Sequence, residues 1–176
     1  IKAMEINLQQ LKKRCLAGID SFRKEGDILI DNDLLLIYKY RPGNKVLGVA
    51  HMDTVRIDNH FQVARMSKKE TVVWNSGLDD RMGVYILLDL LPSIGVECDI
   101  LLTDGEETGK TTARHFSPKH AINDYNWIFS FDRRGDDVVL YCYEDTDTRR
   151  LMAEHGFVVG DGSFSCIATM RDLGVK

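Results

Sequence analysis

Acidic side chains and one histidine follow the apolar runs of this sequence, at points where buried strands would end. The set comprises His51, Asp53, Asp79, Asp80, Glu106, Glu107 and Asp132. Ligands of open α/β sheets bind outside the carboxyl ends of the strands, so we expect these side chains to gather at one place. Converging carboxylates repel one another unless a cation compensates them, and imidazole with carboxylates is a typical ligand set for zinc.

Two pairs within this set suggest separate roles. In an extended segment His51 and Asp53 point to the same side, so Asp53 could accept a hydrogen bond from the imidazole and orient it. The neighbouring side chains of Glu106 and Glu107 diverge, so one can bind metal while the other stays free as a base. A metal lowers the pKa of a bound water toward about 7, and a base must then take its proton.

Each signal alone has a simpler explanation. An H-x-D triplet is common, and Asp79–Asp80 could cap a helix that begins near Arg81. The glutamate pair could begin a helix, where negative charge is favourable, and Asp132 could begin a turn. The regular order of these groups, each after an apolar run, favours the metal site.

The apolar runs also define the elements that would position these residues. Strands are predicted at 31–40, 45–50, 98–104, 126–131 and 136–143, helices at 4–17, 80–92, 108–116 and 147–156, and a hairpin at 63–74. Apolar strands that alternate with helices predict an α/β fold with a mostly parallel, mixed central sheet.

Composition limits the class of protein. The chain has 176 residues, a net charge of −4 and 44% hydrophobic residues, which suits one domain over residues 1–176. The absence of a basic cluster argues against nucleic acid or a membrane surface as partner. Four cysteines without a C-x-x-C pair favour free thiols and hence a cytoplasmic protein. The sequence begins at Ile1, so an export signal before it is left open.

Four motifs carry a resemblance to a known group of enzymes. "HMDTV" (51–55), "GLDDRMGV" (77–84), "TDGEETG" (103–109) and "FSFD" (129–132) resemble motifs of the co-catalytic dizinc exopeptidases, which include aminopeptidases and glutamate carboxypeptidase-like peptidases. The resemblance covers about residues 45–135. It implies a three-layer α/β/α sandwich and two zinc ions per chain, with cobalt or manganese as substitutes.

The resemblance also implies a role for each motif residue. His51 and Asp132 would bind the first zinc, Asp53 would orient His51, Asp79 would bridge both zincs with Asp80 as the alternative, Glu107 would bind the second zinc, and Glu106 would be the general base. Arg81, Arg133 and Arg134 are further candidates for holding a substrate carboxylate or carbonyl.

The chain departs from the family pattern at the second zinc. The family has another histidine ligand near the C-terminus, and His60, His115, His120 and His155 all lie outside the matching context. We expect that the sequence stops before this ligand, which leaves the binding of the second metal open. No interval is long enough for an inserted lid or dimerisation domain, which favours the aminopeptidase-like branch.

The predicted function is therefore zinc-dependent hydrolysis of terminal amide bonds of peptides. One alternative is a deacylase of N-acyl amino acids on the same centre, and another is a catalytically inactive peptide-binding relative. A metallophosphatase is less favoured because no phosphate cradle is present. The expected partner is a peptide or small amide substrate. Related aminopeptidases commonly form homo-oligomers, but no sequence feature defines an interface here.

Overall fold

A five-stranded mixed sheet forms the centre of the chain. The computed structural model describes residues 5–55, 60–68, 70–117, 119–141, 145–162 and 164–170. The strands are β1 (Asp27–Asp31), β2 (Leu35–Lys39), β3 (Val46–His51), β6 (Asp99–Thr103) and β7 (Trp127–Ser130), in the order β1-β2-β6-β3-β7. β1, β6, β3 and β7 run in one direction and β2 in the other, so the predicted mostly parallel, mixed sheet is confirmed.

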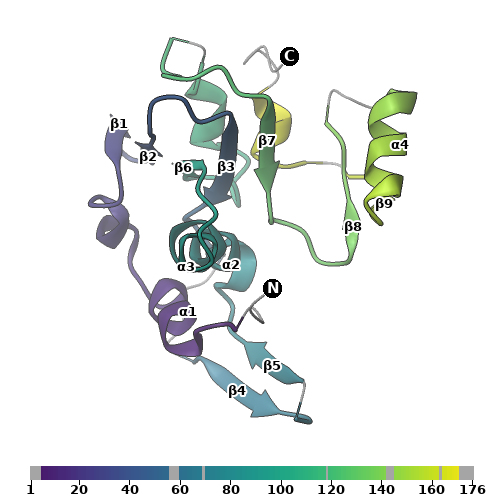
Figure 1. Ribbon diagram of the computed structural model, residues 1–176. Coiled ribbons are helices and arrows are strands. Elements are labelled where there is room, and N and C mark those ends of the chain that lie inside the picture. The colour runs from purple at the N-terminus through teal and green to yellow at the C-terminus, as the bar shows by residue number, and fades with distance from the viewer. Residues whose placement is uncertain are drawn as a thin grey trace.

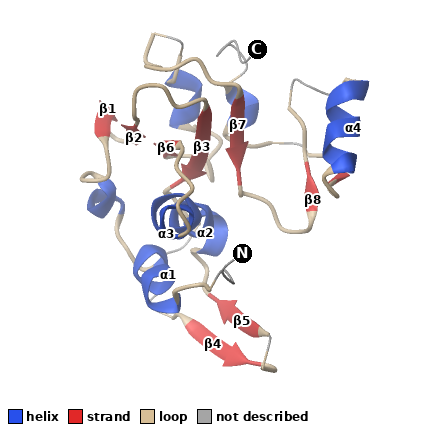
Figure 2. Cartoon of the chain, viewed as in Figure 1, coloured by secondary structure: helices blue, strands red, loops and turns tan. Residues whose placement is uncertain are grey.

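Apolar side chains cover both faces of this sheet. A continuous helical segment, α2 (Leu78–Tyr85), η2 (Ile86–Leu90) and α3 (Leu91–Ser93), covers one face. There Leu87 of η2 packs with Ala50 of β3 and Ile100 of β6. This segment lies below β3 and β6 in Figures 1 and 2. Helix α1 (Leu8–Cys15) packs against α2, and the short turn η1 (Ile19–Phe22) follows it.

The other face of the sheet is covered differently. Val49 and Leu101 pack there against Ala113 of η3 (Thr112–His115), with η4 (Ile167–Thr169) beside it. The predicted helix at 108–116 is wrong, because only the 3₁₀ turn η3 forms. The hydroxyl of Thr112 donates to the Leu35 carbonyl and accepts from the Asp104 N–H, which holds this segment to the sheet.

The remaining helix predictions agree with the structure. Asn7 caps α1 by accepting from the main-chain N–H of Gln10, and Asp145 caps α4 (Thr146–Glu154) in the same way. Gly156 follows α4 with φ of +82°, a conformation that glycine adopts at low cost at a helix end. No helix in the described ranges combines the length and apolarity needed to cross a membrane.

Two small sheets lie outside the central one. The predicted hairpin is confirmed as β4 (Gln62–Arg65) and β5 (Thr71–Trp74), which extends away from the core in Figure 1. The prediction of a fourth buried strand at 136–143 is wrong for residues 136–141, where β8 (Asp137–Val138) is the one strand described and pairs with β9 (Val158–Val159); residues 142 and 143 lie outside the described residues. β8 is half-buried rather than buried, which is consistent with its place beside α4 instead of inside the central sheet.

Candidate metal centre

His51 lies at the carboxyl end of β3 with three carboxylates around one ring nitrogen. The His51 side chain is 1% exposed. Its Nε2 lies 3.2 Å from Asp79 Oδ1, 3.5 Å from Asp132 Oδ1 and 3.8 Å from Glu106 Oε2. These side chains come from the start of α2, the end of β7 and the loop after β6, so the fold brings four predicted site residues together.

The other ring nitrogen of His51 is held by the chain itself. Nδ1 lies 3.0 Å from the main-chain oxygen of Asp53 and 3.4 Å from Asp53 Oδ1. A carbonyl oxygen can only accept, so Nδ1 donates to it and Nε2 of the neutral ring keeps its lone pair for a metal. Asp53 was predicted to orient His51, and the structure places its carbonyl nearer to the ring than its carboxylate.

The carboxylate of Asp53 links two of the site loops. Its Oδ2 accepts from the main-chain N–H of Glu107 at 3.0 Å. Its Oδ1 is buried and has no hydrogen-bond partner among the described residues. The main chain of Glu107 thus lies next to the His51 cluster.

Asp79 and Asp80 differ sharply in their surroundings. Asp80 is 2% exposed, and its two oxygens accept from the N–H groups of His51 at 3.3 Å and Gly83 at 3.0 Å. The Asp79 side chain is 70% exposed and approaches His51 Nε2. His51, Asp80 and Asp132 also offer ligand atoms within 4.8 Å of one another. Each oxygen of Asp80 thus already accepts one main-chain hydrogen bond, whereas Asp79 Oδ1 approaches the ring nitrogen of His51.

Burial and neighbouring charges shift the pKa values of several groups in the site. Burial and the charge of Asp132 raise the pKa of Asp80 well above its usual value. Burial raises the pKa of Asp132, and burial together with the Asp132 charge raises that of Glu106 although His51 opposes it. Burial alone would lower the pKa of His51, but the neighbouring carboxylates of Asp132, Asp53 and Asp79 raise it overall.

The donor set fits a bound cation. One imidazole nitrogen faces carboxylate oxygens of Asp79 and Asp132. Burial, together with the charge of Asp79, raises the pKa of Asp132, whereas the hydrogen bond to His51 lowers the pKa of Asp79. A divalent ion would replace the proton that these groups otherwise share, and zinc is typically bound by nitrogen and carboxylate oxygen. The sequence did not predict two features of this arrangement, namely the contact of the Asp53 carbonyl with His51 and the burial of Asp80. The D-x-x-G spacing from Asp80 to Gly83, in which Asp80 Oδ1 accepts from the Gly83 N–H, could have indicated the second.

Asp104 is a further support that the sequence did not single out. It is 5% exposed, and its Oδ2 accepts from the main-chain N–H of Leu35 at 3.0 Å. Burial raises its pKa. This bond anchors to strand β2 the start of the loop in which Glu106 lies.

The three arginines predicted to hold substrate are engaged elsewhere or are not placed at the centre. Arg81 is fully buried, so it cannot contact a substrate and that prediction is wrong. Arg133 donates to both oxygens of Asp137 at 2.7 Å. No described contact places Arg134 at the centre. Among the histidines, His120 bonds to the Ser117 hydroxyl and His155 to the Leu151 carbonyl.

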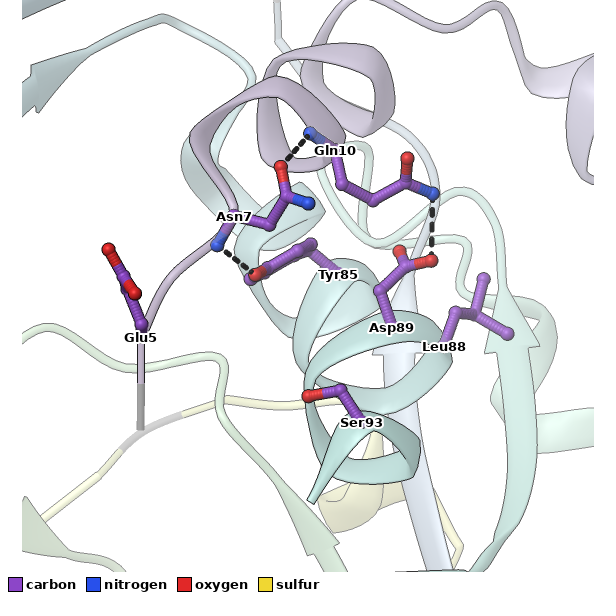
Figure 3. Close-up of a pocket in the computed structure, with 7 residues that line it drawn as sticks. All are labelled: Glu5, Asn7, Gln10, Tyr85, Leu88, Asp89 and Ser93. Atoms are coloured by element: carbon purple, nitrogen blue, oxygen red, sulfur yellow. Dashed lines mark hydrogen bonds between the residues drawn. The ribbon is translucent and has the colours of Figure 1, made fainter. Parts of the chain in front are cut away.

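A separate cavity of about 310 Å³ lies between α1 and the α2–α3 segment. It is lined by Glu5, Asn7, Gln10, Tyr85, Leu88, Asp89 and Ser93 (Figure 3). Figure 3 shows that its polar groups bond to one another, with Asn7 N–H donating to the Tyr85 hydroxyl and Gln10 to Asp89. None of the predicted site residues lines this cavity.

Comparison with known proteins gives little. No protein-family model matches the chain, and no curated protein matches it. Among solved structures, the chain is similar to an aminopeptidase PepT from Bacillus cereus, with a TM-score of 0.45 and 16% sequence identity. The match covers 78% of this chain and 40% of the aminopeptidase. The functional assignment below therefore rests on side-chain geometry.

Proposed function

We propose that the protein is a metal-dependent hydrolase that cleaves terminal amide bonds of peptides in the manner of an aminopeptidase. The observation that carries the proposal is the arrangement at His51. Its Nδ1 is tied to a carbonyl, and its Nε2 faces oxygens of Asp79, Asp132 and Glu106 within 3.8 Å. Such a set combines metal ligands with a carboxylate that is available as a base.

The proposed metal is zinc, with cobalt or manganese as substitutes and two ions per chain. His51, Asp79 and Asp132 would hold the first ion, and Glu107 with Asp79 would contribute to the second. When bound, the ion polarises the substrate carbonyl and lowers the pKa of water, which is the chemistry that amide hydrolysis needs. Burial, and after it the charge of Asp79, raises the pKa of Glu107.

Glu106 is the proposed general base. Burial raises the pKa of its carboxyl, and its side chain is 16% exposed. A carboxylate with a raised pKa removes a proton from the attacking water more readily than an ordinary glutamate. Glu106 then passes that proton to the departing amine as the carbon–nitrogen bond breaks, so the base is regenerated.

The test is Glu106→Gln, with metal content and peptide hydrolysis measured on the same preparation. Metal content should stay unchanged, because Glu106 is not proposed as a ligand, while turnover should fall by about 10²- to 10⁴-fold. Asp79→Ala is the contrasting variant and should lose both metal and activity. Unchanged turnover in metal-loaded Glu106→Gln would reject the base assignment.

Two outcomes would redirect the proposal. Activity on N-acyl amino acids without activity on peptides would identify the deacylase, which uses the same centre. No metal bound even after zinc is added would favour the inactive peptide-binding relative.

The wider predictions belong to this proposal. The proposed location is the cytoplasm, and the free thiols of Cys15, Cys98 and Cys166 support it. Cys142 lies outside the described residues. We also propose a complete three-layer sandwich and a peptide or small amide as the substrate. The proposed assembly is a homo-oligomer, and no nucleic-acid or membrane partner is proposed.

A further inference from the structure

Arg81 connects the start of helix α2 to the end of helix α1. Its side chain is fully buried, and its Nη1 donates to the main-chain oxygens of Arg14 at 3.0 Å and Ala17 at 2.9 Å. The guanidinium lies over the ring of Phe22, 4.7 Å from its centroid. One side chain thus satisfies two carbonyls at the carboxyl end of α1 and packs against the core.

The rest of the guanidinium is poorly satisfied. Neither Nε nor Nη2 of Arg81 has a hydrogen-bond partner among the described residues. Burial lowers the pKa of Arg81 to about 10. A buried charge without full pairing costs stability, and apolar residues of similar volume often replace such groups without loss. Fold stability alone therefore does not account for an arginine at this position.

Its place in the chain suggests another account. Arg81 directly follows Asp79 and Asp80, and Asp80 accepts from the N–H groups of His51 and Gly83. A chain of contacts thus runs from the end of α1 through Arg81 and Asp80 to His51.

We propose that Arg81 is a positioning residue that clamps the start of α2 to the end of α1 and so fixes Asp79 and Asp80 against His51. The inference concerns the site of the proposed function. Its metal readout rests on that function, whereas its metal-free readout does not.

A purely electrostatic role would act in the opposite direction on metal binding. Removing a positive charge near a cation site favours the cation by Coulomb's law. Loss of a clamp instead frees the ligands and weakens binding, since the site must then be ordered when metal binds. The sign of the change in zinc affinity therefore separates the two accounts.

The experiment compares Arg81→Met and Arg81→Lys in the full chain. Amide hydrogen exchange is measured by NMR without metal, and the rates at His51 and Gly83 are taken relative to global unfolding. We expect at least tenfold faster exchange at both amides in Arg81→Met. Arg81→Lys should stay within threefold of the parent chain, because its ammonium can still donate to the two carbonyls. Zinc affinity, measured by competition with a chelator, should fall at least tenfold in Arg81→Met.

Arg14→Met is the matched control. It removes the ion pairs of Arg14 with Asp89 and Glu25 but leaves the Arg14 carbonyl in place. It should lower the melting temperature without changing relative exchange at His51 and Gly83. If Arg81→Met does not fold, Phe22→Leu replaces it, since it removes the ring beneath the guanidinium and keeps the charge. Faster relative exchange at both amides is again expected.

Each result decides the matter. Unchanged exchange at His51 and Gly83 in Arg81→Met would overturn the clamp whether or not zinc binds, and tighter zinc binding in that variant would also overturn it. If the parent chain binds no zinc, the proposed function fails, while the exchange rates still decide the role of Arg81.

Discussion

Asp99 offers a sharp test of how the end of the sheet opposite the metal centre is stabilised. It begins β6 and is fully buried. Its Oδ1 accepts from the Arg41 N–H at 2.9 Å and the Asn44 amide at 2.6 Å. Its Oδ2 accepts from the Asn123 amide at 2.7 Å and the Tyr125 hydroxyl at 2.5 Å. One carboxylate thus joins two loops to the central sheet.

The effect of Asp99→Asn follows from these four bonds. An amide replaces one oxygen, so two donors lose their acceptor. If the new side-chain NH₂ group at position 99 faces Asn123 and Tyr125, the Tyr125 hydroxyl can turn and accept from it, which leaves the Asn123 donor unsatisfied. If the NH₂ group instead faces Arg41 and Asn44, both of those donors lose their acceptor. A buried unsatisfied donor costs about 1–3 kcal/mol. The amide adopts the less costly orientation, so we expect the free energy of unfolding to fall by about 1–3 kcal/mol.

The assay is urea denaturation of Asp99→Asn beside Glu97→Gln. Glu97 pairs with the Arg41 side chain, but both side chains are more than half exposed, so its change should stay within about 0.5 kcal/mol. Zinc affinity of folded Asp99→Asn should stay unchanged, because β6 places Asp99 about 13 Å from the site end of the strand. A loss of stability below about 1 kcal/mol would refute the reasoning about the buried acceptor.

Two further predictions concern the site and helix α4. In Gly83→Ala the new Cβ would overlap Asp80 Oδ1, so the carboxylate must move and zinc affinity should fall at least tenfold. Gly18→Ala, in which the new Cβ meets nothing within 4 Å, should bind zinc normally. Equal affinity in both variants would contradict the role given to Asp80. Hydrogen bonds from Thr148 lower the pKa of Asp145. The Asp145 carboxylate therefore stabilises the fold above the unfolded-state pKa of about 3.9. This contribution is lost as the pH falls through the lower pKa of the folded state. An NMR titration of the Asp145 carboxyl should give a midpoint below 3.9, and a higher midpoint would be evidence against the cap.

The sequence predicted the strands that carry the site because they are apolar runs with polar ends. β3, β6 and β7 all lie where such runs occur, and His51 and Asp132 follow from their ends. Strands buried on both faces have continuous apolar sequences, which makes them easy to recognise. The order of the motifs therefore indicated the convergence that the structure shows.

Other features depend on contacts between distant segments and could not be read from local patterns. The main-chain donors of His51 and Gly83 distinguish Asp80 from Asp79, although the two residues are adjacent and identical in type. The Thr112 hydroxyl donates to the Leu35 carbonyl of β2 and so holds η3 to the sheet. The short 3₁₀ turn η3 takes the place of the predicted helix. Arg81 was predicted as a candidate for holding substrate, but α1 and Phe22 enclose it.

The two ends of the sheet differ in how well their buried polar groups are satisfied. At one end, all four donors around Asp99 find an oxygen. At the other end, Asp53 Oδ1 and two nitrogens of Arg81 have no hydrogen-bond partner within the part of the chain that the structure describes, and burial raises the pKa values of Asp132 and Glu106. Folded proteins generally satisfy buried polar groups, so exceptions that cluster at one place need an explanation. A bound cation would relieve the repulsion among the carboxylates near His51, which supports the proposed function independently of any motif.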